Sequence, residues 1–263
     1  MRKPTCEAGW VDTQPSPKDR FVTVYGRKPV LEALADRTLT VDKVLLADNA
    51  RGESVREIEK AAAARGVPVN KASAHRVKVL AGNGKQDQGV LADVIATRMR
   101  PLTDALRGSR QPRTVLVLDG ITTPANVGMI LRTATAAGVA GIVVPRRGVA
   151  SIDPLVVKAS AGVAFRAPIL RAATAVDAAD ALRAAGFPLY GLAGDAGMSV
   201  FTAKLSTRAA FVLGAETAGV SEAVARLVTD WLAIPMSAGV ESLNVASAAA
   251  VLCFELRRRE ITS

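Results

Sequence analysis

Residues 114–134 read TVLVLDGITTPANVGMILRTA, and this stretch decides the fold class. The apolar run at its start indicates a buried strand over 115–119. Val127, Ile130 and Leu131 then recur at helical spacing, which predicts a helix over 127–137. A buried strand followed directly by a helix is the repeating unit of an α/β fold.

The same alternation continues to the C-terminus. Further strands are expected at 141–144, 167–170, 188–192, 209–213 and 231–234. Further helices are expected at 154–161, 176–185, 221–227 and 243–258. Strands that are apolar throughout and alternate with helices predict a mostly parallel sheet with both faces covered.

A smaller α/β unit is expected before this domain, over residues 21–96. Its patterns predict helices at 26–36, 54–66 and 73–82, and strands at 41–48, 67–70 and 88–96. Residues 1–20 are polar and contain three prolines, which is typical of a disordered tail. Residues 97–113 are basic and hold Pro and Gly, so we expect a linker there, and a domain of residues 114–263 after it.

The net charge of +10 indicates a polyanionic partner such as RNA, because Lys and Arg neutralise phosphates. Residues 1–110 hold 20 Lys and Arg against 13 Asp and Glu, and the remaining residues hold 14 against 11. The excess lies mostly in the N-terminal part. A general solubility role for the charge is the alternative.

The compartment is expected to be the cytoplasm. The two cysteines, Cys6 and Cys253, are far apart in sequence, so neither a disulfide nor a zinc site is expected. No signal peptide and no membrane span is expected, since the apolar C-terminal helix is short and ends in three arginines.

Several common chemistries do not fit the sequence. It contains neither a Walker A motif nor a G-x-G-x-x-G fingerprint, which argues against phosphate cradles and nicotinamide dinucleotides. It has no G-x-S-x-G elbow. The single histidine, His75, lies in the N-terminal unit without Cys or His partners, so no metal site is expected.

Polar residues that local structure does not explain gather in three loops, each at the carboxyl end of an expected strand. Ligands of open α/β sheets bind at that edge. The first loop leads into Asn126 and Arg132, the second carries Glu216, and the third carries Ser242 and Asn244.

These loops resemble the three signature motifs of the SpoU/TrmH family of RNA 2′-O-ribose methyltransferases, in the SPOUT superfamily. The motifs read NVGMILR from 126 to 132, LGAETAG from 213 to 219, and IPM from 234 to 236 followed by SLNV from 242 to 245. The segments VYGRKPVLEAL and QGVLADV also resemble the L30e-like substrate-binding domain of the family's bacterial large-subunit rRNA guanosine methyltransferases.

The resemblance implies a C-terminal trefoil-knotted methyltransferase domain, a small N-terminal L30e-like domain, a homodimer, and S-adenosylmethionine as cofactor. It places the cofactor against Gly214, Ile234, Met236 and Leu243. An apolar C-terminal helix fits burial behind that pocket.

The resemblance also implies catalytic roles. Arg132 would activate the ribose 2′-hydroxyl, and because arginine stays protonated we expect it to bind phosphate and stabilise alkoxide character rather than act as a base. Asn126 would orient Arg132 or the ribose, and Glu216 would position its neighbours or offset the sulfonium charge. Ser242 and Asn244 would hydrogen-bond the reacting groups. Capping of the helix is the alternative role for Ser242.

The leading hypothesis is methylation of large-subunit rRNA. Methylation of tRNA, a non-catalytic RNA-binding role in ribosome assembly, and an antibiotic-resistance methyltransferase are the alternatives. Two positions depart from the family pattern: Thr217 stands where a glycine commonly follows the glutamate, and Asp87 stands where a histidine is common.

Overall fold

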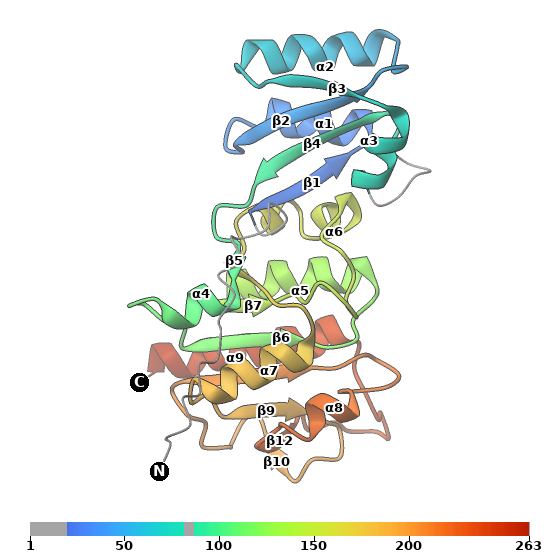
Figure 1. Ribbon diagram of the computed structural model, residues 1–263. Helices are drawn as coiled ribbons and strands as arrows, with labels where there is room; N and C mark the ends of the chain where they lie inside the picture. The colour runs from blue at the N-terminus through green and yellow to red at the C-terminus, as the bar shows by residue number, and fades with distance from the viewer. Residues whose placement is uncertain (1–19, 82–86, 263) are drawn as a thin grey trace, which may run out of the picture.

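The computed structural model describes residues 20–81 and 87–262, in two α/β parts (Figure 1). The N-terminal part runs in the order β1 (Phe21–Tyr25), α1 (Arg27–Ala35), β2 (Val41–Ala47), α2 (Glu53–Ala64), β3 (Val69–Ala72), α3 (Ala74–Ala81) and β4 (Val90–Ile95). Its sheet has the order β1-β4-β2-β3. Strand β4 is antiparallel to β1 and β2, and β2 is parallel to β3, so the sheet is mixed.

The C-terminal part is built on one parallel sheet. Its strands are β5 (Arg100–Pro101), β6 (Thr114–Leu118), β7 (Gly141–Val143), β8 (Ile169–Arg171), β9 (Leu189–Leu192), β10 (Met198–Ser199), β11 (Ala209–Leu213) and β12 (Asp230–Ala233). Its helices are α4 (Leu102–Arg107), α5 (Pro124–Ala136), α6 (Pro154–Ala159), the 3-10 turn η2 (Val163–Phe165), α7 (Ala175–Ala184), α8 (Glu222–Ala225) and α9 (Val245–Thr262). The strand order is β10-β12-β9-β11-β6-β7-β8-β5.

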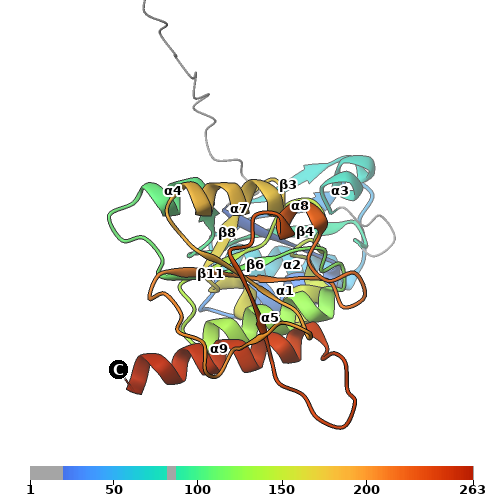
Figure 2. The ribbon, with the colours of Figure 1, turned by 90° about the horizontal axis from the view of Figure 1, so that it is seen from below.

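Strand β6 shows why this sheet is covered on both faces. Val115 and Val117 belong to the core that also holds residues of α4, α7 and α8, whereas Leu116 and Leu118 belong to the core that holds residues of α5 and α9. Successive side chains of a strand point to opposite faces, so an unbroken apolar run requires helices on both. Figure 2 shows α5 and α9 below the sheet and α4, α7 and α8 above it.

Close approach of α5 to α6 explains Gly128 of the first motif. A Cβ at Gly128 would lie 2.5 Å from the Cβ of Ala159 and 2.7 Å from the backbone oxygen of Val156. Glycine is therefore required for helix packing. Helix α5 also packs against α9, so it connects the interior of the C-terminal part to the last helix.

The α/β class and all six expected C-terminal strands are confirmed, with shifted boundaries, whereas three strands were not predicted. Strand β1 is only five residues long; it buries Val22 and Val24 in the main core and Tyr25 in a smaller cluster with Val77 of α3. Strands β5 and β10 have two residues each. Strand β5 pairs with β8, so part of the expected linker 97–113 belongs to the C-terminal sheet, and α4 within it buries Leu102 and Ala105.

Helix α9 is not covered on every side by its own chain, which leaves part of its cover to the expected homodimer. It buries one face, including Ala249 and Leu252, but Phe254 is 52% exposed and Ile261 is 68% exposed. Burial of Cys253 on the covered face raises the pKa of its thiol to about 12. Cys6 and the expected tail before Arg20 lie outside the described residues.

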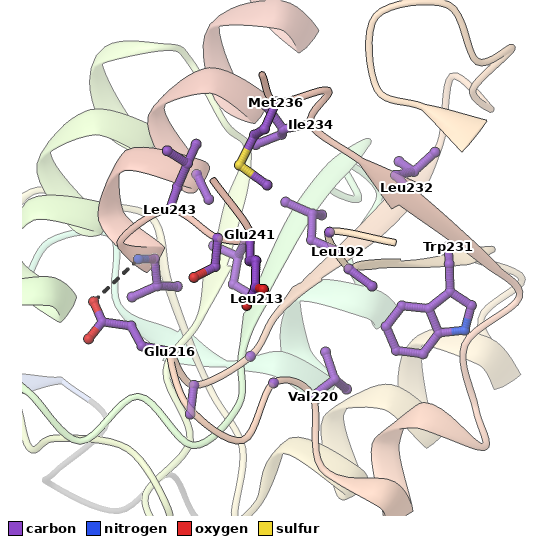
Figure 3. A pocket seen from close by; sticks show the side chains of 18 residues that line it. Leu192, Leu213, Glu216, Val220, Trp231, Leu232, Ile234, Met236, Glu241 and Leu243 are labelled. Carbon is purple, nitrogen blue, oxygen red and sulfur yellow. Dashed lines mark hydrogen bonds between the residues drawn. The ribbon is translucent and has the colours of Figure 1, made fainter. Parts of the chain in front are cut away.

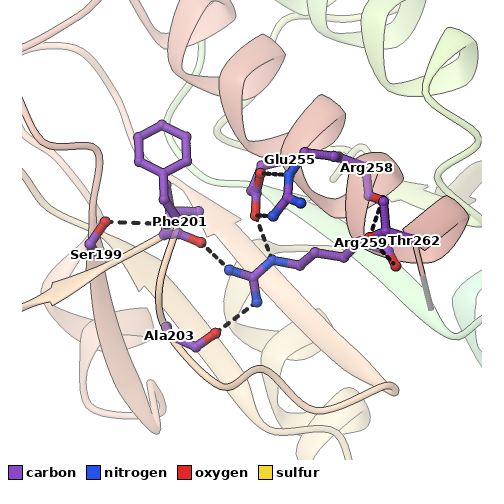
Figure 4. Close-up of polar contacts among 8 residues, drawn as sticks. Ser199, Phe201, Ala203, Glu255, Arg258, Arg259 and Thr262 are labelled. Carbon is purple, nitrogen blue, oxygen red and sulfur yellow. Dashed lines mark hydrogen bonds and ion pairs between the residues drawn. The ribbon is translucent and has the colours of Figure 1, made fainter.

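The end of α9 is fixed by an ion-paired cluster rather than left as a solvated arginine end (Figure 4). The buried carboxylate of Glu255 accepts hydrogen bonds from Arg258 at 2.8 and 2.9 Å and from Arg259 at 2.7 Å. Arg259 also donates to the backbone oxygens of Val200 and Ala203, at 2.6 and 2.7 Å. The cluster thus ties the last helix to the segment that follows β10.

No helix within residues 20–81 and 87–262 combines the length and apolar character needed to cross a membrane. In the same part of the chain, no group of three or more His, Cys, Asp or Glu side chains is placed to hold a metal ion. The trefoil knot implied by the family resemblance stays a prediction.

Candidate active site

A pocket of about 400 Å³ lies at the carboxyl ends of β9, β11 and β12, beside the start of α9 (Figure 3). This is the sheet edge at which α/β proteins bind ligands. Gly214, Ile234, Met236 and Leu243, the four residues expected around the cofactor, all line it. Most of the other side chains that line it are apolar, among them Leu192, Leu213 and Trp231.

The loop after β11 forms one wall, and its shape depends on Gly214. Backbone hydrogen bonds join Ala215 and Gly219 in both directions, at 2.9 and 2.8 Å, and close a tight turn. A Cβ at Gly214 would lie 2.2 Å from the backbone carbon of Gly219 and 2.3 Å from the nitrogen of Val220. Any larger residue at 214 would therefore open the turn.

Three of the five expected catalytic residues form one hydrogen-bonded group. The Oε1 atom of Glu216 accepts from Asn126 Nδ2 at 3.0 Å, from Asn244 Nδ2, and from the backbone nitrogen of Val245 at 3.4 Å. Asn244 Nδ2 also donates to Asn126 Oδ1 at 3.2 Å. A carboxylate at the first turn of α9 is also favoured by the helix dipole. Residues 118 positions apart are thus held together.

Helix α9 begins at Val245, two residues later than expected, and Asn244 is the residue that caps it. Its Oδ1 accepts from the backbone nitrogens of Ala246 at 2.9 Å and Ser247 at 3.4 Å. The capping alternative for Ser242 is therefore wrong. Ser242 lines the pocket, where its hydroxyl is exposed.

Arg132 is not brought to this pocket. It is exposed on α5, six residues after Asn126, and it does not line the cavity. Six residues correspond to well over one and a half helical turns, so the two side chains leave the helix on different sides. A single chain therefore contains the hydrogen-bonded group and the pocket, with Arg132 apart from both.

The two departures from the family pattern have structural explanations. Thr217 is exposed and has a negative φ, whereas Gly219 has a φ of 65° and makes the turn, so no glycine is needed at 217. Asp87 accepts from the backbone nitrogen of Gly89 at 2.7 Å. The side chain of Gln88, whose φ is 50°, accepts from the backbone nitrogen of Arg27 at 3.0 Å at the start of α1.

Sequence reasoning missed part of the pocket. The end of β9 and the loop after it contribute Leu192, Ala193 and Gly194, although only the loops after three other strands had been considered. Trp231 lies against Gly191, where a Cβ would come within 2.5 Å of the indole ring. Gly191 and Gly194 lie within and just after an expected strand, and such glycines were the sequence signal for this part of the pocket.

Asp119 is a second missed residue. It is 7% exposed, and its Oδ2 accepts from the backbone nitrogen of Ser221 at 2.7 Å. The end of β6 thereby holds the far end of the loop that carries Glu216. Its position at the end of an apolar strand was the signal in the sequence.

Two family descriptions match the chain. The SpoU rRNA Methylase family matches residues 113–254, and the RNA 2′-O ribose methyltransferase substrate binding family matches residues 23–99. Between them they span most of the described chain.

Named relatives have similar sequences over nearly their whole length. The 23S rRNA (guanosine-2′-O-)-methyltransferase RlmB of Xanthomonas campestris is 31% identical over 90% of this chain and 96% of its own. The protein of the same name from a Burkholderia species is 32% identical over 92% and 98%.

Solved structures are similar as well. The SpoU methyltransferase AviRb of Streptomyces viridochromogenes, in complex with AdoMet, has a TM-score of 0.60 at 26% identity and covers 92% of this chain and 91% of its own. An AdoMet-bound rRNA methyltransferase from Sinorhizobium meliloti has a TM-score of 0.62 at 25% identity, covering 91% and 88%.

Proposed function

This chain belongs to the SpoU rRNA methylase family, and on that premise we propose that it methylates the ribose 2′-hydroxyl of a guanosine in large-subunit rRNA. Both named relatives carry that activity in their names, and they align with both parts of this chain. The names of these relatives favour rRNA over tRNA as the target, and residues 23–99 match a family of RNA substrate-binding domains. A separate binding domain suits RNA, which is recognised by shape and by its 2′-hydroxyls.

S-adenosylmethionine is the cofactor, and the pocket fits it. The volume of about 400 Å³ lies in the range of small-molecule sites. The lining is apolar and carries neither Lys nor Arg among the described residues, which suits a cofactor without phosphates and with a net positive charge. When bound, the cofactor supplies the methyl group that is transferred.

The group formed by Asn126, Glu216 and Asn244 carries the proposal of catalysis at this pocket. Glu216 also lines the pocket, so the group reaches the cavity edge. It fixes the orientation of Glu216, and fixed polar groups lower the barrier of methyl transfer by holding the reactants in line. Ser242, an exposed residue that lines the pocket, has the proposed role of hydrogen-bonding the ribose. A binding protein would not need this arrangement.

Arg132 has the proposed role of binding the phosphate next to the target ribose and stabilising alkoxide character. Because it lies outside the pocket of its own chain, this role requires a second protomer or an RNA that extends to α5. Helices α5 and α9 pack together and each leaves a large apolar side chain exposed: Met129 is 40% exposed and Phe254 is 52% exposed. We propose that a homodimer covers this surface and completes the site.

The experiment that tests the function is transfer of labelled methyl groups from S-adenosylmethionine to RNA from cells that lack the protein. We expect label in large-subunit rRNA, resistant to alkaline cleavage at one linkage, and none with Arg132→Ala. Label in tRNA would move the proposal to tRNA methylation. Tight RNA binding without label in any fraction would favour the non-catalytic assembly role.

A mixing experiment tests the dimer. Arg132→Ala and Asn244→Ala proteins, each expected to be inactive alone, are unfolded together and refolded as mixed dimers. If Arg132 acts on the partner's pocket, about a quarter of wild-type activity returns, because half of the dimers are mixed and each has one intact site. Continued inactivity would contradict action across the dimer and favour an RNA that extends to α5 of the same chain. We also propose a cytoplasmic location, which an rRNA target supports.

A further inference from the structure

Glu241 is a charged residue of the pocket whose carboxylate has no partner among the described residues. Of the described residues that line the cavity, Glu216 and Glu241 are the two that carry a charge. Glu216 receives hydrogen bonds from Asn126, Asn244 and Val245. No hydrogen bond or ion pair joins the carboxylate of Glu241 to any other residue within 20–81 and 87–262.

The backbone of Glu241 is held in place even though its carboxylate is unpaired. Its carbonyl oxygen would lie 2.7 Å from a Cβ at Gly194, so the loop before α9 rests directly on the loop after β9. Figure 3 shows Glu241 in the middle of the cavity, between Glu216 on one side and Trp231 on the other. The backbone of Glu241 is therefore held by two loops that contact each other, and the residue lines the pocket.

A carboxylate only accepts hydrogen bonds, so the group that satisfies it must be a donor. S-adenosylmethionine has two positive groups, a sulfonium without N–H donors and an α-ammonium with three. We propose that Glu241 binds the α-ammonium group of the cofactor and so selects ligands that carry the amino-acid end. This inference rests on the cofactor assignment of the proposed function.

Binding measurements by calorimetry test this with three ligands: S-adenosylmethionine, S-adenosylhomocysteine and 5′-methylthioadenosine. The first two have the α-ammonium, only the first has the sulfonium, and the third has neither. For Glu241→Gln we expect the affinity for the first two to fall together, about two- to fivefold because the site is exposed, with no change for the third. Glu57→Gln, an exposed change of equal charge on α2, is the matched control and should leave all three unchanged.

Each other outcome overturns the inference. Equal weakening of all three ligands would mean that Glu241 contacts the adenosine part that they share, or that the substitution deforms the loop. Weakening for S-adenosylmethionine alone would assign Glu241 to the sulfonium, and unchanged affinities would make Glu241 a solvated residue of the rim. Failure of the wild-type protein to bind any of the three would instead count against the cofactor assignment itself. Melting temperatures of both variants show that each is folded.

Discussion

Gly214→Ala should distort the pocket more than any other glycine-to-alanine substitution in its lining. The new Cβ would lie 2.2 Å from the backbone carbon of Gly219, against 3.4 Å for the closest ordinary contact. The turn must therefore move by about 1.2 Å, and both neighbours are backbone atoms that cannot rotate away. Such a shift breaks the two hydrogen bonds between Ala215 and Gly219.

The expected loss follows from those two bonds. At about 1 kcal/mol each, the free energy of unfolding should fall by about 2 kcal/mol. Five residues of this loop line the pocket, so we also expect the affinity for S-adenosylmethionine to fall at least about tenfold, which corresponds to 1.4 kcal/mol. Urea unfolding and calorimetry measure the two quantities.

Gly197→Ala is the matched control. A Cβ at Gly197 meets nothing within 4 Å, and its φ is not positive. The substitution should leave cofactor affinity unchanged and stabilise the protein by about 0.4–1 kcal/mol, because alanine restricts the unfolded chain. Should Gly214→Ala match this control in both stability and affinity, the steric argument for the second motif would be refuted.

Three further changes test other parts of the structure. Asn244→Ala should lower the unfolding free energy by about 1 kcal/mol through loss of the helix cap, whereas Asn244→Ser keeps a cap. Neither variant should transfer methyl groups, because both lack the amide that donates to Glu216. An active Asn244→Ser variant would contradict this role of the amide. Hydrogen bonds from Arg258, then Arg259, lower the pKa of Glu255 from 4.5 to about 2, so its stabilisation is complete above pH 4.5 and is lost as the pH falls toward 2. Wild type should therefore exceed Glu255→Gln in urea stability at pH 6 and lose that advantage toward pH 2; a pH-independent difference would exclude the ion pair as its cause. Phe254→Glu should give a folded monomer by light scattering, and a persistent dimer would place the interface elsewhere.

The clearest strand predictions are those for strands whose burial is complete. Strands such as β6 and β11 are covered on both faces, so they appear in the sequence as unbroken apolar runs. Strand β1 has only five residues, of which Phe21 and Thr23 are partly exposed, so its sequence is a weaker signal. Strands β5 and β10 exist because a neighbouring strand pairs with two residues, which no local pattern encodes.

The positions of some site residues could likewise be predicted from the sequence, whereas that of Arg132 could not. The motifs identified the residues, and the carboxyl-end rule placed Gly214, Ile234 and Met236 at one edge of the sheet. The rule cannot say which side of a helix faces that edge, and so it could not show that Arg132 points elsewhere. That position depends on how α5 packs against α6 and α9, which involves residues far apart in sequence.

Asn244 explains why polar residues stand at the start of the apolar last helix. Its Oδ1 caps α9, and its Nδ2 donates to Glu216 and Asn126. The buried face of α9 fixes where the helix begins, and the cap fixes the rotamer of Asn244. The orientation of Glu216 beside the pocket is therefore set by hydrophobic packing of the helix behind it. A substitution in the buried face of α9, such as Leu252→Ala, should therefore change the orientation of Glu216 through Asn244, although Leu252 contacts neither the cofactor nor RNA.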